Sequence, residues 1–255
     1  MTFKKACISL GIFLAVTISG PALSAQSEAP LITCSIAGAK GIYGYITGGL
    51  DGSGSPTASV GQINFNGAGK STGTFTQSKD GTISTYSFTG TYTVNANCTG
   101  SGTLSGGGKT STFGLVIDSA GTHVEVAGTD PGHVSGGEAL AQGTPTCTTA
   151  GVKGTYGFHG SGTLVGTGAV AFAGLYALDG TGKLTGTETI STAGTITTQA
   201  ISGTYSVAST CRGKLSYTLG GKPSTWSTVI VNGGKSILAI KTDSGSVATS
   251  RITQQ

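Results

Sequence analysis

The chain has 255 residues, of which 46 are glycine and only 9% are charged. Hydrophobic residues make up 36% of it, too many for a disordered chain, and the scarcity of strong helix formers argues against a helical protein. The formal net charge is +4, or +2 without two lysines near the N-terminus, and no basic stripe is interleaved with aromatic residues, so the composition does not indicate nucleic-acid binding.

The first 25 residues have the pattern of a cleaved export signal. Lys4 and Lys5 precede an apolar run over 6–20, and small residues follow it up to Ala25. This run is shorter than the ~20 residues that a helix needs to cross a bilayer. We therefore expect cleavage after Ala25, a mature chain without a transmembrane segment, and a secreted or periplasmic location. An uncleaved anchor is the alternative, which the lack of a basic stop-transfer cluster disfavours.

The mature chain repeats one sequence pattern twice. Gly90–Cys98 reads GTYTVNANC and returns 113 positions later as GTYSVASTC at Gly203–Cys211. The two copies align at this interval without a gap from Cys34 to the last residue, so the mature chain consists of two copies of one unit. The expected segments are an export signal (1–25), an N-terminal extension (26–33), a first copy (34–142), a linker (143–146) and a second copy (147–255).

Cys7 lies in the export signal, so four cysteines remain after cleavage. Cys34 and Cys98 are 64 positions apart, as are Cys147 and Cys211, so a duplicated unit predicts one disulfide inside each copy. An oxidising compartment permits such bridges, and each would close a long loop, stabilising the fold by about 4 kcal/mol. A metal site built from all four cysteines and reactive thiols are the alternatives, but zinc sites favour closely spaced cysteine pairs, which this sequence lacks.

Both copies alternate apolar and polar residues between glycine-rich turns, which is typical of β-strands. In the first copy we expect eight strands, at 41–49, 58–66, 70–78, 82–96, 99–105, 110–118, 122–129 and 133–141. Asn66-Gly67 and its counterpart Asp179-Gly180 are strong signals for tight hairpin turns. Strands joined by such short turns pair antiparallel.

Eight antiparallel strands in each copy must bury one face and protect their edges, and closure into a barrel does both. The sequence therefore predicts an all-β protein made of two tandem copies of an eight-stranded antiparallel up-and-down barrel, with a β-sandwich as the alternative. The runs FGLVI at Phe113–Ile117 and STVIV at Ser227–Val231 are almost entirely apolar. We expect both strands to be covered on both faces.

Candidates for catalysis are few. His123 and Glu125 would share one face of a strand and could form an acid/base or metal pair, although no histidine is common to both copies and an ordinary solvated pair is favoured. Asp130 and Asp243 are the only acids kept in both copies, and each precedes a turn sequence. We therefore predict no catalytic residue, no metal and no cofactor, and we favour a protein that is not an enzyme.

Tyrosines and lysines that recur in both copies are the candidates for ligand binding. The predicted residues are Tyr43, Tyr92, Tyr156, Tyr205, Lys40 and Lys153. An eight-stranded barrel is either filled by its side chains or holds one small ligand, and tyrosine rings at its mouth could stack on that ligand. In the alternative interpretation the tyrosines cap the core and the lysines protect strand edges.

These residues predict a secreted, non-catalytic binding module for a small apolar ligand or a glycan. An extracellular structural or surface-interaction protein is the alternative, motivated by low charge, Thr/Gly richness and duplication. An isomerase or cyclase of the barrel type is a third hypothesis, for which His123 and Glu125 are the candidates. The sequence does not identify a partner.

The frame CSxAGxKGxYGY, GxxxFNGxGKxxG and SFTGTYTVNANCTG, followed by STFGLVI and TDxGxV, resembles uncharacterised secreted bacterial Gly/Thr-rich proteins that carry the GTYTVNxDCTG motif. The resemblance covers nearly all of both copies, although the second copy has STCRG where the motif has NxDCTG. It implies an extracytoplasmic β-barrel domain, loosely similar to the calycin and allene oxide cyclase barrels. It brings no catalytic residues to this chain.

Overall fold

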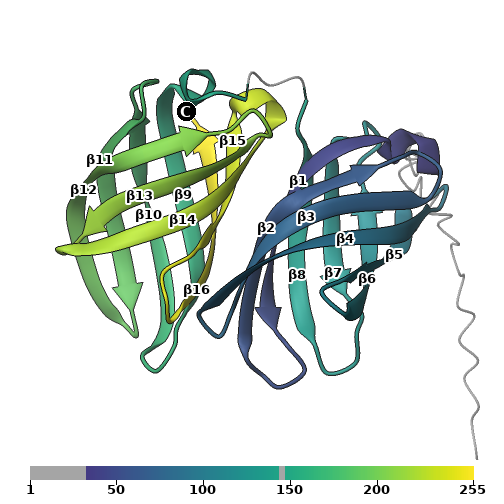
Figure 1. Ribbon diagram of the computed structural model, residues 1–255, viewed down its shortest axis with the longest axis horizontal. Helices are drawn as coiled ribbons and strands as arrows, with labels where there is room; N and C mark the ends of the chain where they lie inside the picture. The colour runs from purple at the N-terminus through teal and green to yellow at the C-terminus, as the bar shows by residue number, and fades with distance from the viewer. Residues whose placement is uncertain (1–32, 144–146) are drawn as a thin grey trace, which may run out of the picture. The chain divides into compact units, whose positions relative to one another are not determined.

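The computed structural model describes residues 33–143 and 147–255, and most of these lie in β-strands (Figure 1). The predicted export signal and most of the predicted extension and linker lie outside the described residues. Within the described ranges, no helical segment combines the length and the apolar character that a membrane crossing needs.

The first copy forms a closed barrel of eight antiparallel strands, β1 to β8, in which each strand pairs with its neighbour in sequence and β8 pairs with β1 (Figure 1). Its strands are β1 (Gly41–Leu50), β2 (Pro56–Phe65), β3 (Lys70–Lys79), β4 (Thr82–Val94), β5 (Thr99–Gly106), β6 (Lys109–Ile117), β7 (His123–Gly128) and β8 (Val134–Ala141). The predicted strands match these closely.

The second copy repeats this architecture with strands β9 to β16, and β16 closes the barrel on β9. Its strands are β9 (Gly154–Leu164), β10 (Gly168–Leu178), β11 (Lys183–Thr192), β12 (Thr195–Val207), β13 (Arg212–Leu219), β14 (Lys222–Val231), β15 (Ser236–Lys241) and β16 (Ser246–Gln254). The predicted fold class is confirmed, because each sheet closes on itself instead of forming the two packed sheets of a sandwich.

One disulfide ties the start of each copy to the turn after its fourth strand. Cys34 is bonded to Cys98 and Cys147 to Cys211, so the predicted pairing is confirmed. A short 3-10 helix follows the first cysteine of each copy, η1 (Ile36–Ala39) or η2 (Thr149–Val152). A third, η3 (Asn232–Gly234), joins β14 to β15.

Large aromatic side chains fill both barrels. Along β4, Phe88 and Tyr92 are buried while the intervening threonines are exposed, as expected when alternate residues of a strand face the interior. The rings of Phe65 and Tyr92 lie 4.6 Å apart between centroids. Gly73 makes room for this packing, because a Cβ there would stand 2.4 Å from Cζ of Phe88. The interiors are therefore packed cores.

The two barrels share a third apolar cluster, which is formed by the outer faces of their strands. Its members are Ile46, Ala58, Val60 and Leu140 of the first barrel, with Val229, Val231, Leu238, Ile240 and Val247 of the second. Gly44 allows this close approach, because a Cβ there would stand 2.4 Å from Cγ1 of Val231 and 2.5 Å from Cγ1 of Val229. We call this cluster the barrel interface.

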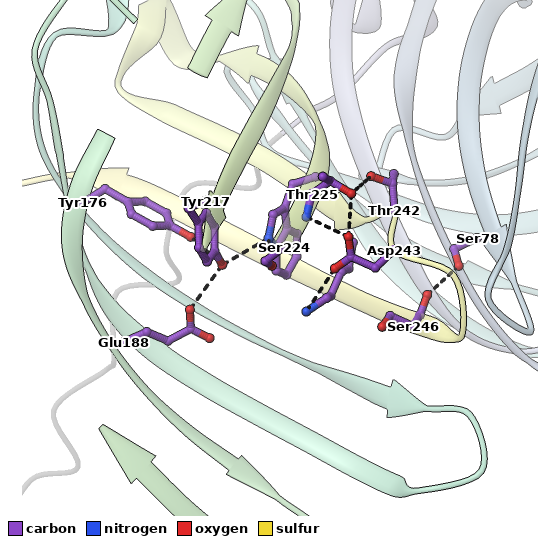
Figure 2. Close-up of polar contacts among 11 residues, drawn as sticks. Ser78, Tyr176, Glu188, Tyr217, Ser224, Thr225, Thr242, Asp243 and Ser246 are labelled. Carbon is purple, nitrogen blue, oxygen red and sulfur yellow. Dashed lines mark hydrogen bonds and ion pairs between the residues drawn. The ribbon is translucent and has the colours of Figure 1, made fainter. Parts of the chain in front are cut away.

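Polar contacts surround the barrel interface. The Arg212 guanidinium donates hydrogen bonds to the hydroxyls of Thr74 and Thr76, at 2.9 and 2.8 Å. Ser78 donates to the backbone carbonyl of Ser246 at 2.8 Å, a contact drawn in Figure 2. The apolar cluster and these hydrogen bonds together hold the barrels against each other.

The interface explains one correct and one wrong prediction about strand burial. Ser227–Val231 is covered on both faces, because Ile230 points into its own barrel while Val229 and Val231 contact the other barrel. Phe113–Ile117 is not, because Val116 on its outer face is 52% exposed. The sixth strand is thus covered on both faces in the second barrel (β14) but not in the first (β6).

Candidate functional site

The four predicted ligand-binding tyrosines lie in the barrel cores, between 1% and 5% exposed. Tyr156 donates its hydroxyl hydrogen bond to the carbonyl of Gly234 at 2.9 Å, and Tyr43 donates in the same way to the carbonyl of Gly121. Burial raises the pKa of Tyr43 to about 12, which keeps this hydroxyl protonated. These two tyrosines hold the turn between the sixth and seventh strands of each barrel.

Tyr92 and Tyr205 hold a different turn. The Tyr92 hydroxyl accepts a hydrogen bond from the backbone of Gly67 at 2.9 Å, and the Tyr205 hydroxyl accepts one from Gly180 at 2.8 Å. The aliphatic stem of Lys40 lies against Gly67, as the stem of Lys153 lies against Gly180. The structure therefore brings each predicted lysine and one tyrosine together at a hairpin turn, with the tyrosine hydroxyl bonded to backbone. Their role in ligand binding stays a prediction.

Asp130 and Asp243 serve as turn formers. The Asp243 carboxylate accepts hydrogen bonds from the backbone and the hydroxyl of Thr225, at 2.9 and 2.6 Å (Figure 2). Asp130 makes the same pair of contacts with Thr112. Each carboxylate thus ties the loop before the last strand of its barrel to the sixth strand.

The second barrel contains an interior polar cluster that was not predicted from the sequence (Figure 2). It comprises Tyr176, Glu188, Tyr217, Ser224 and Trp226, all at most 3% exposed. The Tyr217 hydroxyl donates to the Glu188 carboxylate at 3.2 Å. It accepts from the Trp226 indole nitrogen at 3.1 Å and from the Tyr176 hydroxyl at 3.3 Å, while the indole also donates to Ser224 at 3.1 Å.

Burial raises the pKa of Glu188, because the charged carboxylate loses water in the barrel core. The hydrogen bond from Tyr217 and the charge of Lys241 act in the opposite direction. Lys241 is held near the cluster by Asp243, at 3.3 Å between Nζ and Oδ2, and its Nζ lies 5.8 Å from the centre of the Trp226 ring. Chemically, Glu188 is a carboxyl group that can retain a proton above its ordinary pH range.

The first barrel has no such cluster. The five matching positions, 113 residues earlier, are Ile63, Phe75, Leu104, Ser111 and Phe113. The sequence does contain a sign of this cluster, because Glu188 replaces the Phe75 of the first copy. Residues that both copies share do not reveal it. The two barrels therefore share a fold and differ in the chemistry of their interiors.

Replacing Glu188 by Gln should change how stability depends on pH. A raised pKa means that the folded state holds the proton more tightly than the unfolded state. Glu188 therefore lowers the unfolding free energy progressively as pH rises from 4.5, the ordinary pKa of a glutamate, through the raised pKa. The Glu188→Gln variant should therefore gain unfolding free energy relative to the wild type between pH 4 and pH 8. Urea titrations at both pH values measure this difference, and a constant difference would contradict a raised pKa.

Two adjoining grooves lie beside the barrel interface, each with a volume of about 820 Å³. The first groove is lined mainly by small and apolar residues of β1, β2, β9, β10 and β16, among them Gly48, Leu50, Ala58, Ala171 and Val247. The second groove is lined by charged residues as well, including Glu125, Glu138, His159 and Arg251. Ser161 and Thr249 line both grooves.

The fold and the disulfides define the class of this protein as a disulfide-bonded tandem β-barrel protein. No family model matches the chain, and no curated protein matches it. The family resemblance drawn from the sequence motifs is therefore not confirmed by either comparison.

Two solved structures are similar over most of the chain. A protein of unknown function from the DUF3598 family of Nostoc punctiforme is 10% identical over 86% of this chain and 98% of its own, with a TM-score of 0.22. A mutant of the Rh. blastica porin is 10% identical over 83% of this chain and 98% of its own, with a TM-score of 0.18. Both likenesses are too weak to carry a functional argument.

Proposed function

We propose that this protein works outside the cytoplasm as a non-catalytic binding protein for a small apolar ligand, and that the ligand lies in the first groove. The observation that carries this proposal is the groove itself. Its volume of about 820 Å³ falls within the range of small-molecule sites, about 300–1,000 Å³. The packed barrel interiors, in contrast, favour a site on the outer walls.

The lining of the first groove favours an apolar ligand over a glycan. No described residue that lines it is aromatic or charged, whereas sugar binding generally uses an aromatic ring as a stacking face. Leu50 lines the groove and is 44% exposed, and Val134, its partner across β1 and β8, is 67% exposed. Leu50 therefore provides apolar surface in the groove that a bound ligand would cover, and Val134 lies next to it on the paired strand.

Two substitutions on one strand test the proposal. Ala171 and Ala177 are both exposed on the outer face of β10, but only Ala171 lines the first groove. The full chain, titrated with the fluorescent fatty acid cis-parinaric acid, should bind it saturably. Ala171→Phe should weaken binding at least about tenfold by filling the groove, and Ala177→Phe should leave it unchanged.

Equal affinities in the two variants, or no saturable binding by the wild type, would refute the proposed site. Thermal unfolding of both variants verifies the comparison, since each substitution is on an exposed position and should leave the fold intact.

A further inference from the structure

Three metal-ligating side chains gather on the outer face of the first barrel. His123 and Glu125 are two residues apart on β7, so their side chains point to the same face. Glu138 on β8 stands directly opposite Glu125 in the strand register. We call His123, Glu125 and Glu138 the His–Glu–Glu cluster.

The distances within the cluster are close to those of a metal site. Nε2 of His123 lies 3.1 Å from Oε1 of Glu125 and 3.1 Å from Oε2 of Glu138, and one ligand atom from each residue lies within 4.8 Å of the other two. In a tetrahedral zinc site with bonds of about 2.1 Å, ligand atoms stand about 3.4 Å apart. Small movements of the side chains would therefore seat the ion.

The ring nitrogen that points between the two carboxylates lacks a hydrogen bond. Nε2 of His123 is buried, and among the side chains of the described residues it is one of two such polar atoms without a hydrogen-bond partner. A neutral imidazole leaves this buried nitrogen facing two acceptor oxygens, which is unfavourable. A cation held by the Nε2 lone pair would remove this cost.

The charges also favour a cation. Two carboxylates directly opposite each other on paired strands repel. Arg251 contacts Glu138 across the barrel interface and offsets one of these charges, but with a neutral histidine the group keeps a net negative charge. One imidazole nitrogen and two carboxylate oxygens are ligands that zinc accepts, with the fourth position open to water.

We propose that the His–Glu–Glu cluster binds a divalent transition-metal ion of the zinc type. The site belongs to the first copy alone, because the matching positions in the second are Ser236, Leu238 and Arg251. The sequence suggested only the His123 and Glu125 pair, since Glu138 joins them through strand pairing. Glu125 and Glu138 line the second groove, so the site does not depend on the ligand proposed for the first.

Calorimetric titration of the full chain with Zn²⁺, in a buffer that does not bind metals, tests this proposal. One ion should bind with an affinity that His123→Ala and Glu125→Gln each lower at least about tenfold. His133→Ala is the matched control, because His133 lies in the turn between β7 and β8 and outside the cluster, and it should bind zinc like the wild type.

Zinc binding that survives both His123→Ala and Glu125→Gln would overturn the proposal, as would the absence of binding by the wild type. Glu125 is exposed, with 65% of its side chain accessible, so a loss of zinc binding in Glu125→Gln cannot be ascribed to misfolding.

Discussion

Replacing Gly44 by Val should destabilise the chain by about 3 kcal/mol, at the upper end of what overpacking a core costs. The added Cβ alone would stand within 2.5 Å of the Cγ1 atoms of Val229 and Val231, which are 0% exposed. Neither valine can turn away, because β-branched side chains have few rotamers and both are enclosed. The clash is relieved only if the barrels move apart and expose the apolar cluster between them.

Gly157 provides the matched control for this prediction, because it holds the same position in the second copy. A Cβ there would approach only the amide end of Gln255, the last residue of the chain, at 2.6 Å. This side chain can move, so Gly157→Val should cost far less. Urea unfolding of both variants measures the two losses of stability, and equal losses would contradict a close contact between the barrels at Gly44.

Removing the disulfide of the first copy should cost about 4 kcal/mol, since the bridge closes a loop of 64 residues. The loss should depend on the residue that replaces Cys98. Cys98 has a φ of 67°, a left-handed conformation that costs residues with a Cβ about 1–2 kcal/mol and costs glycine little. Cys34→Ala with Cys98→Gly should therefore be about 1 kcal/mol more stable than Cys34→Ala with Cys98→Ala.

The second copy offers an independent repetition, because Cys211 has a φ of 61°. The corresponding replacements of Cys147 and Cys211 should reproduce both the large loss and the smaller advantage of glycine. Guanidinium titrations of the purified double variants give the free energies. A double alanine variant as stable as the wild type would show that the bridge adds no stability.

The repeat made the common features of the two copies predictable. Eight strands, tight turns at Gly67 and Gly180 and one disulfide in each copy all follow from patterns that the copies share. The strand limits were predicted to within a few residues because glycine turns mark them. Shared positions, such as Tyr92 and Tyr205, proved to bind backbone in turns, as residues that support a common fold should.

The features that differ between copies could not be predicted in this way. Ile46 of the barrel interface corresponds to His159, and Leu238 corresponds to Glu125, so some apolar positions of the interface are polar or charged in the other copy. The effect of such differences can be interpreted only when it is known which faces of the two barrels are in contact. The interior polar cluster was missed for a related reason, because Glu188 stands where the first copy has Phe75.

These differences have a physical consequence for association. The barrels meet through unlike faces, and a contact of this kind can in principle repeat and build filaments. The face of the first barrel that corresponds to β14 and β15 carries Asp118 and Glu125 where the second has Val231 and Leu238. A further chain would have to bury these charges, so we expect the contact to end with two barrels.

Both grooves require that the two barrels form one rigid body. Residual dipolar couplings of backbone amides, measured separately for residues 41–141 and 154–254 in a weakly aligned sample, test this most directly. One rigid body gives one common alignment tensor for the two sets. Two tensors of different magnitude and orientation would mean that the barrels move independently, and would rule out the rigid arrangement.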